Sequence, residues 1–319
     1  MSDAPKDVQD LAASRAERRA AKDYSGADEL RDRIAAAGWT IVDGPEGWRL
    51  EPAASEAPEP AVTRLRAQDV TSVLEQPASA DVSIHWVVEG WPDDVRRAIA
   101  SFRANAGGRD VHFVVADVTG EEPGSWGEDV EVVSLEAGTG WGAARNAGLK
   151  RTRGRIVLVM DGSVEVTGEA LGPLEAALAD PTVGVCGPFG IVTPDLREFD
   201  STDGPECDAI EGYCMAFRRE ILTSAGLFDE KYRWYRTADI EYSFRIKDQG
   251  LRAVVVPVSV ERHEHRMWFQ TPPAERAKWS KRNFYRFLDR WRDRYDLTVS
   301  GKPPSEDHHE HHEPHEHRP

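Results

Sequence analysis

The sequence predicts an α/β protein built on a mostly parallel sheet, with a small α+β unit in front of it. Apolar runs at 82–88, 111–115 and 156–160 alternate with polar helical stretches, a pattern typical of β-α-β units with right-handed crossovers. A glycine-punctuated turn at 140–148 opens one helix, and Asp161 stands directly after the last apolar run. An open α/β sheet forms a nucleotide crevice where a carboxylate at a strand tip lies beside such a helix start.

Bulk properties narrow the class of protein. The chain has 319 residues and a net charge of −16, so it lacks the basic field that nonspecific nucleic-acid or anionic-membrane binding requires. Its three cysteines follow no metal-binding spacing and are expected to be reduced thiols. No apolar stretch approaches the roughly 20 residues of a membrane-spanning helix. We therefore expect a cytoplasmic protein, with peripheral association at the inner membrane face left open.

Residues 1–52 form a unit of their own. Good helix formers from Leu11 onward predict a first helix, and Ser25 is expected to cap a second helix that ends before Gly38. Two short β-forming stretches at 40–42 and 48–50, joined by a Gly/Pro-rich turn, predict a β-hairpin.

The run from Arg19 to Asp32, with the Gly-Trp pairs that follow it, resembles the small C-terminal domain of cysteinyl-tRNA synthetases. In the synthetases that domain helps to recognise tRNA, so the resemblance implies possible tRNA binding by residues 1–52. Acidic and basic residues are nearly balanced in this stretch, which favours the alternative of an oligomerisation or docking module.

Composition divides the rest of the chain. Residues 53–80 are rich in Ala, Pro, Glu and Ser and are expected to form a flexible linker. Residues 81–300 form the main domain, and the His-rich tail 301–319 is expected to be disordered. In the main domain, the pattern predicts further elements: a helix at 92–105, strands at 130–133, 210–217 and 251–256, and helices at 239–249 and 274–295.

Residues 82–266 resemble the family 2 glycosyltransferases. The motifs are Gly-x-x-x-Ala-Arg-Asn-x-Gly at 140–148, the strand-tip Asp161, and Ala-Asp-Ile-Glu-Tyr-Ser-Phe-Arg at 238–245, in the family's order. The resemblance implies the GT-A fold, a Rossmann-like nucleotide-diphospho-sugar transferase sheet. It also implies transfer of a sugar, with inversion, from a nucleoside-diphosphate sugar to the hydroxyl of an unidentified sugar, lipid or small-molecule acceptor.

The resemblance assigns the diphosphate and a Mg²⁺ or Mn²⁺ ion to Asp161, and oxygen ligands suit such a cation. The family's second aspartate is Ser163 here, a weak neutral ligand that leaves metal dependence open. By the same resemblance, Asp117 binds the nucleotide base, and Val88 and Glu89 abut the ribose or base. Each of the two acids ends a predicted parallel strand, so all these groups are expected at one edge of the sheet.

Arg145 and Asn146 lie one turn inside the helix that opens at Gly142. The glycines allow close backbone approach to a ligand, and the free N–H groups at a helix start favour an anion. Arg145 offers a planar fork of donors to a phosphate or a nucleobase carbonyl. In the family this arginine contacts the nucleotide, so both residues are predicted to bind the donor.

Asp239 matches the aspartate that removes the acceptor proton in the family, and a carboxylate within hydrogen-bond reach of a hydroxyl can do so. The family's preceding glutamate is Ala238 here, and a plain helix N-cap is the structural alternative for Asp239. His263 and His265 share one face of a strand. The resemblance implies that His263 completes the metal shell.

Two functions other than sugar transfer are compatible with the sequence. A sugar-phosphate nucleotidyltransferase has the same fold logic, but the residues after the first strand, 89–92, do not form its glycine-rich basic loop. A catalytically inactive scaffold that binds tRNA or a synthetase partner is favoured by Ser163 and Ala238, where the family has acids. Turnover of a nucleotide sugar separates the enzyme from the scaffold.

Overall fold

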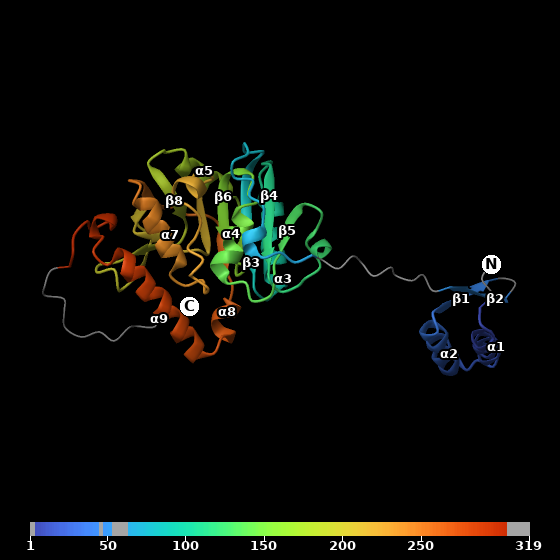
Figure 1. The fold of residues 1–319 in the computed structure, drawn as a ribbon. Helices are drawn as coiled ribbons and strands as arrows, with labels where there is room; N and C mark the ends of the chain where they lie inside the picture. The colour runs from blue at the N-terminus through green and yellow to red at the C-terminus, as the bar shows by residue number, and fades with distance from the viewer. Residues whose placement is uncertain (1–3, 45–46, 53–62, 305–319) are drawn as a thin grey trace. The chain divides into compact units, whose positions relative to one another are not determined.

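The computed structural model describes residues 4–44, 47–52 and 63–304 (Figure 1). The chain divides into two compact units, Met1–Ala61 and Val62–Pro319, and each is described by itself. The predicted tail from residue 305 on and the predicted linker from 53 to 62 lie outside the described residues. Among the described residues, no helix is long and apolar enough to cross a membrane.

The N-terminal unit is a pair of helices with a β-hairpin, as predicted: α1 (Lys6–Ala20), α2 (Tyr24–Ala36), β1 (Trp39–Gly44) and β2 (Gly47–Pro52). Asp23, rather than the predicted Ser25, caps α2, because its carboxylate accepts a backbone N–H at 3.0 Å. Gly38 follows α2 in left-handed backbone, with φ +79°. Arg15 joins helix to hairpin through two hydrogen bonds to Asp43, at 3.0 and 2.9 Å.

The main domain is built on an eight-stranded sheet. In sheet order its strands are β11 (Glu206–Cys207), β14 (Arg252–Val255), β8 (Val183–Gly187), β13 (Cys214–Arg218), β6 (Gly154–Met160), β3 (Ala80–Val88), β4 (Val111–Asp117) and β5 (Val130–Ser134). The strands from β6 to β5 are parallel, and β13 lies antiparallel beside β6. The chain runs outward from β3 to β5 and returns on the other side of β3 as β6. Such a reversal opens a crevice at the carboxyl ends of the strands.

Helices cover both faces of this sheet (Figure 1). The helices α3 (Pro92–Asn105) and α5 (Leu171–Leu178) pack in one apolar cluster, and α4 (Trp141–Leu149) and α7 (Ala238–Lys247) in another. Successive residues of β6 alternate between the two clusters, so the clusters lie on opposite faces. A third cluster packs α9 (Pro273–Trp291) on α7. The short helices are α6 (Ile221–Ser224), α8 (Arg266–Gln270), η1 (Ala67–Asp69), η2 (Pro123–Trp126) and η3 (Tyr295–Leu297).

Two small sheets were not predicted from the sequence, although a strand leading to His263 and His265 was expected. One is a ribbon of β7 (Val164–Val166) with β15 (Val260–Arg262), and the other joins β9 (Gly190–Val192) to β10 (Asp200–Thr202) and β12 (Ala209–Ile210). Strands of two or three residues are too short for their alternation to be recognised in a sequence. The β7–β15 ribbon is the one that matters for the site.

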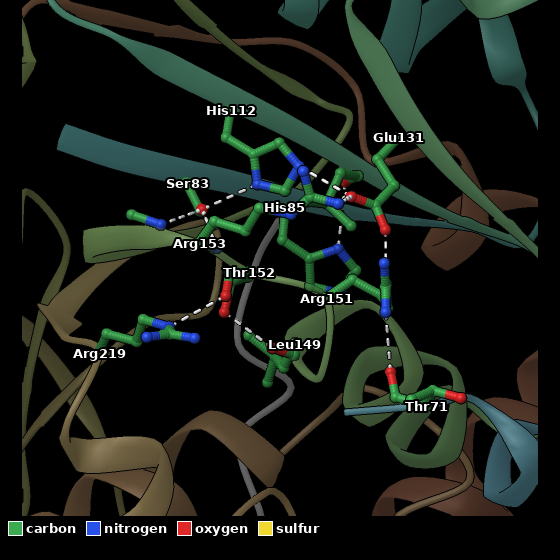
Figure 2. A network of polar contacts seen from close by, with 12 residues as sticks. Thr71, Ser83, His85, His112, Glu131, Leu149, Arg151, Thr152, Arg153 and Arg219 are labelled. Carbon is green, nitrogen blue, oxygen red and sulfur yellow. Dashed lines mark hydrogen bonds and ion pairs between the residues drawn. The ribbon is translucent and has the colours of Figure 1, made fainter. Parts of the chain in front are cut away.

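A polar network joins β3, β4 and β5 near their amino ends (Figure 2). Ser83 Oγ accepts the Arg153 backbone N–H at 2.8 Å and lies 3.1 Å from His112 Nδ1. His112 Nε2 lies 3.1 Å from a carboxylate oxygen of Glu131, which also accepts a hydrogen bond from the Arg153 side chain at 2.8 Å. Arg151 donates to the other carboxylate oxygen at 2.5 Å. Three donors therefore converge on Glu131.

We expect Glu131→Gln to destabilise the main domain at neutral pH. Burial alone would raise the pKa of Glu131, but the hydrogen bonds from His112 and Arg151 and the arginine charges lower it to about 2. The stabilisation is present above the ordinary carboxyl pKa and is lost as pH falls towards 2. Chemical denaturation at pH 7 should show a loss on the order of 3 kcal/mol, shrinking as pH is lowered from 5 to 3. The exposed Glu220→Gln serves as the control, and an equal loss in both variants would contradict this account.

The predicted linker extended too far, because part of it belongs to the main domain. Leu65 forms a parallel bridge with Leu135 at the end of β5. Further along, Arg219 donates to the backbone oxygens of Val73 at 2.6 Å and Gln76 at 2.8 Å. The main domain therefore includes the residues from Leu65 to β3, which lie along the sheet before the first strand begins.

Candidate active site

The predicted site residues gather at the carboxyl ends of β3 and β6. The two strands are parallel neighbours, with Val82 opposite Ile156, so they end at the same edge of the sheet. Glu89 follows β3 and Asp161 follows β6. This edge lies at the reversal of strand order, where α/β sheets place their ligands.

Asp161 accepts three hydrogen bonds in a turn after β6. Its Oδ1 accepts the backbone N–H of Ser163 at 2.8 Å and the Ser163 hydroxyl at 2.5 Å, and its Oδ2 lies 3.1 Å from His265 Nε2. Burial alone would raise the pKa of Asp161, but the His265 charge and the hydrogen bonds outweigh burial and hold that pKa far below its usual range. Asp161 is therefore a fixed negative charge, and Ser163 orients it.

The β7–β15 ribbon explains why His265 reaches Asp161. In this antiparallel pair Arg262 lies opposite Val164. Three residues further along each strand's extension, the same register brings His265 opposite Asp161. The His265 side chain is 9 % exposed, and its Nδ1 is buried without a hydrogen-bond partner among the described residues.

The structure does not bring His263 to Asp161. The backbone N–H of His263 donates to the Ser163 carbonyl at 2.8 Å, while its Nε2 lies 2.9 Å from Glu165. Glu165 in turn pairs with Arg97 at 3.2 Å. The imidazole expected to complete a metal shell is therefore engaged along the ribbon, and His265 occupies the position beside Asp161.

Arg145 lies beneath the strand ends, 3 % exposed. Its guanidinium donates to the backbone oxygens of His85 at 3.0 Å and Met160 at 3.4 Å and lies 5.0 Å from the centre of the Trp141 ring. Burial lowers the pKa of Arg145 to about 10, and the negative charges of Asp161 and Glu89 oppose that change. The predicted nucleotide arginine therefore sits close to both strand-tip acids and fixes the ends of β3 and β6.

Glu89 is a carboxylic acid whose pKa is raised. Burial raises the pKa of Glu89 to about 7, a change that Arg145 opposes and Asp161 strengthens. A carboxyl group with this pKa is available in both protonation states near neutral pH. It can therefore donate or accept a hydrogen bond at the rim of the crevice.

Two of the predicted donor contacts are occupied within the protein. Asn146, 2 % exposed, donates through Nδ2 to the backbone oxygen of Phe228 at 2.9 Å and to Glu230 at 3.2 Å. It thus fastens α4 to the loop before α7 instead of facing the crevice. The Val88 side chain is fully buried in the core, and only its position at the end of β3 borders the site.

Asp117 is also committed to its own turn. The carboxylate, fully buried, accepts the Thr119 backbone N–H at 2.8 Å, the Thr119 hydroxyl at 2.6 Å and the Gly120 N–H at 3.3 Å. The structure therefore places Asp117 at the predicted strand end, but with both oxygens turned into the loop. Contact with a nucleobase would require this turn to open.

Asp239 is the second residue of α7, and its carboxylate binds the backbone of Gly212. Its Oδ2 accepts the Gly212 N–H at 2.8 Å, and its Oδ1 accepts the N–H of Ile240 at 2.9 Å. Thr237, in left-handed backbone at φ 70°, occupies the N-cap position instead. Burial raises the pKa of Asp239, and the backbone hydrogen bonds oppose that rise. A carboxylate with a raised pKa is a better proton acceptor than an exposed one.

Around Asp239 lie residues that are outside the family motifs. Burial, together with the neighbouring Asp239, raises the pKa of Glu211 to about 7. Arg262 lies 3.7 Å from Glu211 and stacks 4.0 Å from the centre of the Tyr213 ring. The Tyr235 ring contacts the His265 ring, with centroids 4.6 Å apart. Glu211 and Tyr213 lie in the loop between β12 and β13, Arg262 ends β15, and Tyr235 lies in the loop before α7.

Asp161 and His265 fit a divalent cation as a partial ligand set. They supply one carboxylate oxygen and, once Nε2 carries no proton, one imidazole nitrogen. Among the described residues, no group of three or more His, Cys, Asp or Glu side chains gathers in a way that could hold a metal. A cation bound here would therefore need phosphate oxygens or water to complete its coordination.

Comparison with known proteins identifies similar sequences and folds. Residues 92–242 match the family model described as Glycosyl transferase family 2. The structure resembles GalNAc-T7 crystallised with UDP, GalNAc and Mn²⁺, with a TM-score of 0.54 at 17 % identity over 69 % of this chain and 50 % of that one. It also resembles the mannosyltransferase PcManGT from Pyrobaculum calidifontis in complex with GDP-Man and Mn²⁺, with a TM-score of 0.50 at 20 % identity over 69 % and 67 % of the chains.

The relatives found by sequence are cysteine–tRNA ligases, and the matches are short. The chain is 45 % identical to cysteine–tRNA ligase 1 of Burkholderia lata over 60 residues, and 50 % identical to the Kocuria rhizophila enzyme over 46 residues. These stretches cover 19 % and 14 % of this chain but only 13 % and 10 % of the ligases. The match is thus to a small part of the ligases. The family match is thus to residues 92–242, and the fold of the main domain is that of the GT-A glycosyltransferases.

Proposed function

We propose that the main domain transfers a sugar, with inversion, from a nucleoside-diphosphate sugar to an acceptor hydroxyl. Asp239 is the base in this proposal, and Asp161 with His265 receives the diphosphate and its divalent cation. This proposal rests on the neighbouring residues Gly212 and Tyr213, which bind the two acids. The N–H of Gly212 donates to Asp239 at 2.8 Å, while the carbonyl of Tyr213 accepts the Asp161 N–H at 3.1 Å. Asp239 and Asp161 are therefore both hydrogen-bonded to the segment formed by Gly212 and Tyr213.

The chemistry follows from this placement. The acceptor oxygen forms a bond to the anomeric carbon as its proton passes to Asp239, and the bond from that carbon to the diphosphate oxygen breaks. The raised pKa of Asp239 suits it to take that proton, and Arg145 lies close to the charge that develops on the leaving group. A divalent cation at Asp161 would neutralise the departing diphosphate. Attack from the side opposite the leaving group inverts the anomeric centre.

The first test is nucleotide binding by the full chain. Calorimetric titration with UDP, GDP, dTDP and ADP, each with and without Mn²⁺, should give one preferred nucleotide whose affinity rises with the metal. The matching nucleotide sugar should then be hydrolysed slowly in the absence of acceptor. Failure of all four nucleotides to bind would refute the proposal. Binding without any turnover of the sugar would instead favour the inactive scaffold that Ser163 suggests.

Glu211→Gln should alter the pH dependence of the reaction and leave donor affinity unchanged. Wild-type Glu211 ionises near pH 7, and its charge then makes the adjacent Asp239 more basic. The pH profile of kcat should therefore lose an inflection near pH 7 in the variant. The effect on stability is opposite to that of Glu131→Gln, because the folded state favours the neutral form of Glu211 and ionised Glu211 destabilises it. Above pH 7 the variant should be more stable than the wild type, by about 2 kcal/mol.

For the N-terminal unit we propose a docking role. Its similarity to a small part of cysteine–tRNA ligases makes tRNA the first partner to test, while its balanced charge favours a protein partner. A gel shift with total tRNA at two salt concentrations decides between the two. Binding that weakens steeply with salt would support tRNA.

A further inference from the structure

The loop before α7 carries an arginine that the proposed mechanism does not use. Arg236 follows Trp234 and Tyr235 in this loop. The backbone oxygens of Trp234 and Arg236 each accept a hydrogen bond from the Asn283 side chain, both at 2.8 Å. Asn283 is fully buried on α9, so α9 fixes the path of the loop. The position of Arg236 is therefore set by the packing of α9 and not by an ion pair of its own.

This loop lies against both halves of the candidate site. The Tyr235 ring contacts the ring of His265, which holds Asp161. Asp239 follows only three residues after Arg236, and the Arg236 charge favours the ionised forms of both Asp239 and Glu211. Arg236 is thus close to the groups that would surround the attacking hydroxyl.

Arg236 shares an aromatic ring with a second arginine. The guanidinium carbons of Arg236 and Arg276 lie 4.8 and 4.6 Å from the centre of the Trp268 ring. Arg276 also donates to the Trp268 backbone oxygen at 3.1 Å. All three residues are half-buried, and in the described parts of the chain neither arginine pairs with a carboxylate within 4.0 Å. A guanidinium held by an aromatic face keeps in-plane N–H donors available for a ligand.

Several other arginines of the chain are paired with carboxylates. Arg252 and Arg294 each pair with two carboxylates, as expected in a chain with 56 acidic and 40 basic residues. Among the described residues neither Arg236 nor Arg276 has a carboxylate within 4.0 Å, although the charges of Asp239 and Glu211 are near enough to interact with Arg236. Their guanidinium donors suit an oxyanion, because guanidinium groups bind phosphate and carboxylate through paired hydrogen bonds.

We propose that Arg236, Trp268 and Arg276 form a binding site for an anionic group, a phosphate or a carboxylate, on the acceptor. The proposal rests on the proposed function, since it takes Asp239 as the base for the acceptor hydroxyl. The acceptor is then a hydroxyl compound that carries an oxyanion, either a soluble phosphate ester or a phospholipid headgroup. Its hydroxyl lies at Asp239, and its anionic group lies on the two arginines.

The test uses the full chain saturated with Mn²⁺ and its preferred nucleoside diphosphate, so that the donor site is filled. Glycerol 3-phosphate and inorganic phosphate are then titrated calorimetrically. We expect binding that weakens at least tenfold in both Arg236→Gln and Arg276→Gln. Arg282→Gln is the matched control, because Arg282 lies on the same helix, 5.4 Å from the centre of the Trp279 ring, and should bind as the wild type does. Thermal unfolding verifies that each variant is folded.

A second arm separates the two sources of the anion. Sedimentation with vesicles of 30 % phosphatidylglycerol in phosphatidylcholine that depends on Arg236 identifies a lipid headgroup, whereas binding of glycerol 3-phosphate alone identifies a soluble acceptor. The proposal fails if neither probe nor vesicle binds in an Arg236-dependent way. It fails equally if phosphate binds only without nucleotide and competes with it, since the arginines would then serve the donor. Should no nucleotide bind at all, Arg236-dependent phosphate binding to the chain alone would retain the anion site while the proposed function fell.

Discussion

Asp239→Asn should lower kcat about 10³-fold and leave the affinity for the preferred nucleotide within about twofold. The amide retains the size of the side chain and an oxygen that can accept the hydrogen bond from the Gly212 N–H, which Asp239 Oδ2 accepts at 2.8 Å in the wild type. It cannot accept the proton of the acceptor hydroxyl. Turnover with a saturating donor and calorimetric nucleotide binding measure the two effects separately.

The control for this experiment is Asp248→Asn on the same helix. Asp248 is exposed at the C-terminal end of α7 and pairs with Arg294 at 2.7 Å, away from the site. It should leave turnover unchanged. An Asp239→Asn protein that melts early but retains full turnover per folded molecule would show that Asp239 only holds the loop at Gly212.

Asp161→Ala should abolish metal-dependent nucleotide binding, with a loss in affinity of at least about 100-fold. Among the residues that the structure describes, the lost carboxylate is the charged oxygen ligand that lies beside His265, at 3.1 Å. Near a diphosphate, a bare carboxylate would repel the ligand unless a cation bridges the two charges. Titration of the nucleotide with and without Mn²⁺ measures this coupling, and Asp161→Asn tests the charge with less change in packing.

A pair of histidine variants sharpens the second experiment. His265→Ala should reproduce the loss of Mn²⁺-dependent affinity, whereas His263→Ala should retain it, because the His263 ring faces Glu165. Glu261→Gln, an exposed change on the same ribbon, controls for its stability. Unchanged Mn²⁺ dependence in Asp161→Ala would remove the cation from this site.

The main elements could be predicted from the sequence because their patterns are long. The predicted helix at 92–105 coincides with α3, and the buried strands β3, β4 and β6 lie where continuous apolar runs indicated them. From these strands alone, the rule that ligands bind where strand order reverses brings Asp161, Glu89 and Arg145 together. The structure places all three residues at that edge.

The local chemistry could not be predicted in the same way. The two histidines share a face by alternation, so the choice between them depends on the register of β15 with β7, a strand of three residues without a recognisable pattern. Asp117 was placed correctly at its strand end, but its use by Thr119 depends on the shape of one turn. Hydrogen bonds of this kind are decided by a few tenths of an ångström of backbone position, which residue types do not encode.

The β7–β15 ribbon makes the spacing between residues as important as their identity. Asp161 precedes β7 by three residues and His265 follows β15 by three, so the antiparallel register places the two residues opposite each other. Deleting or inserting one residue in either arm would turn the imidazole to the other side of the ribbon, whereas a change of side chain at Val260 or Glu261 would leave the count intact. In related chains, gaps in an alignment should therefore avoid both arms even where the residues themselves vary.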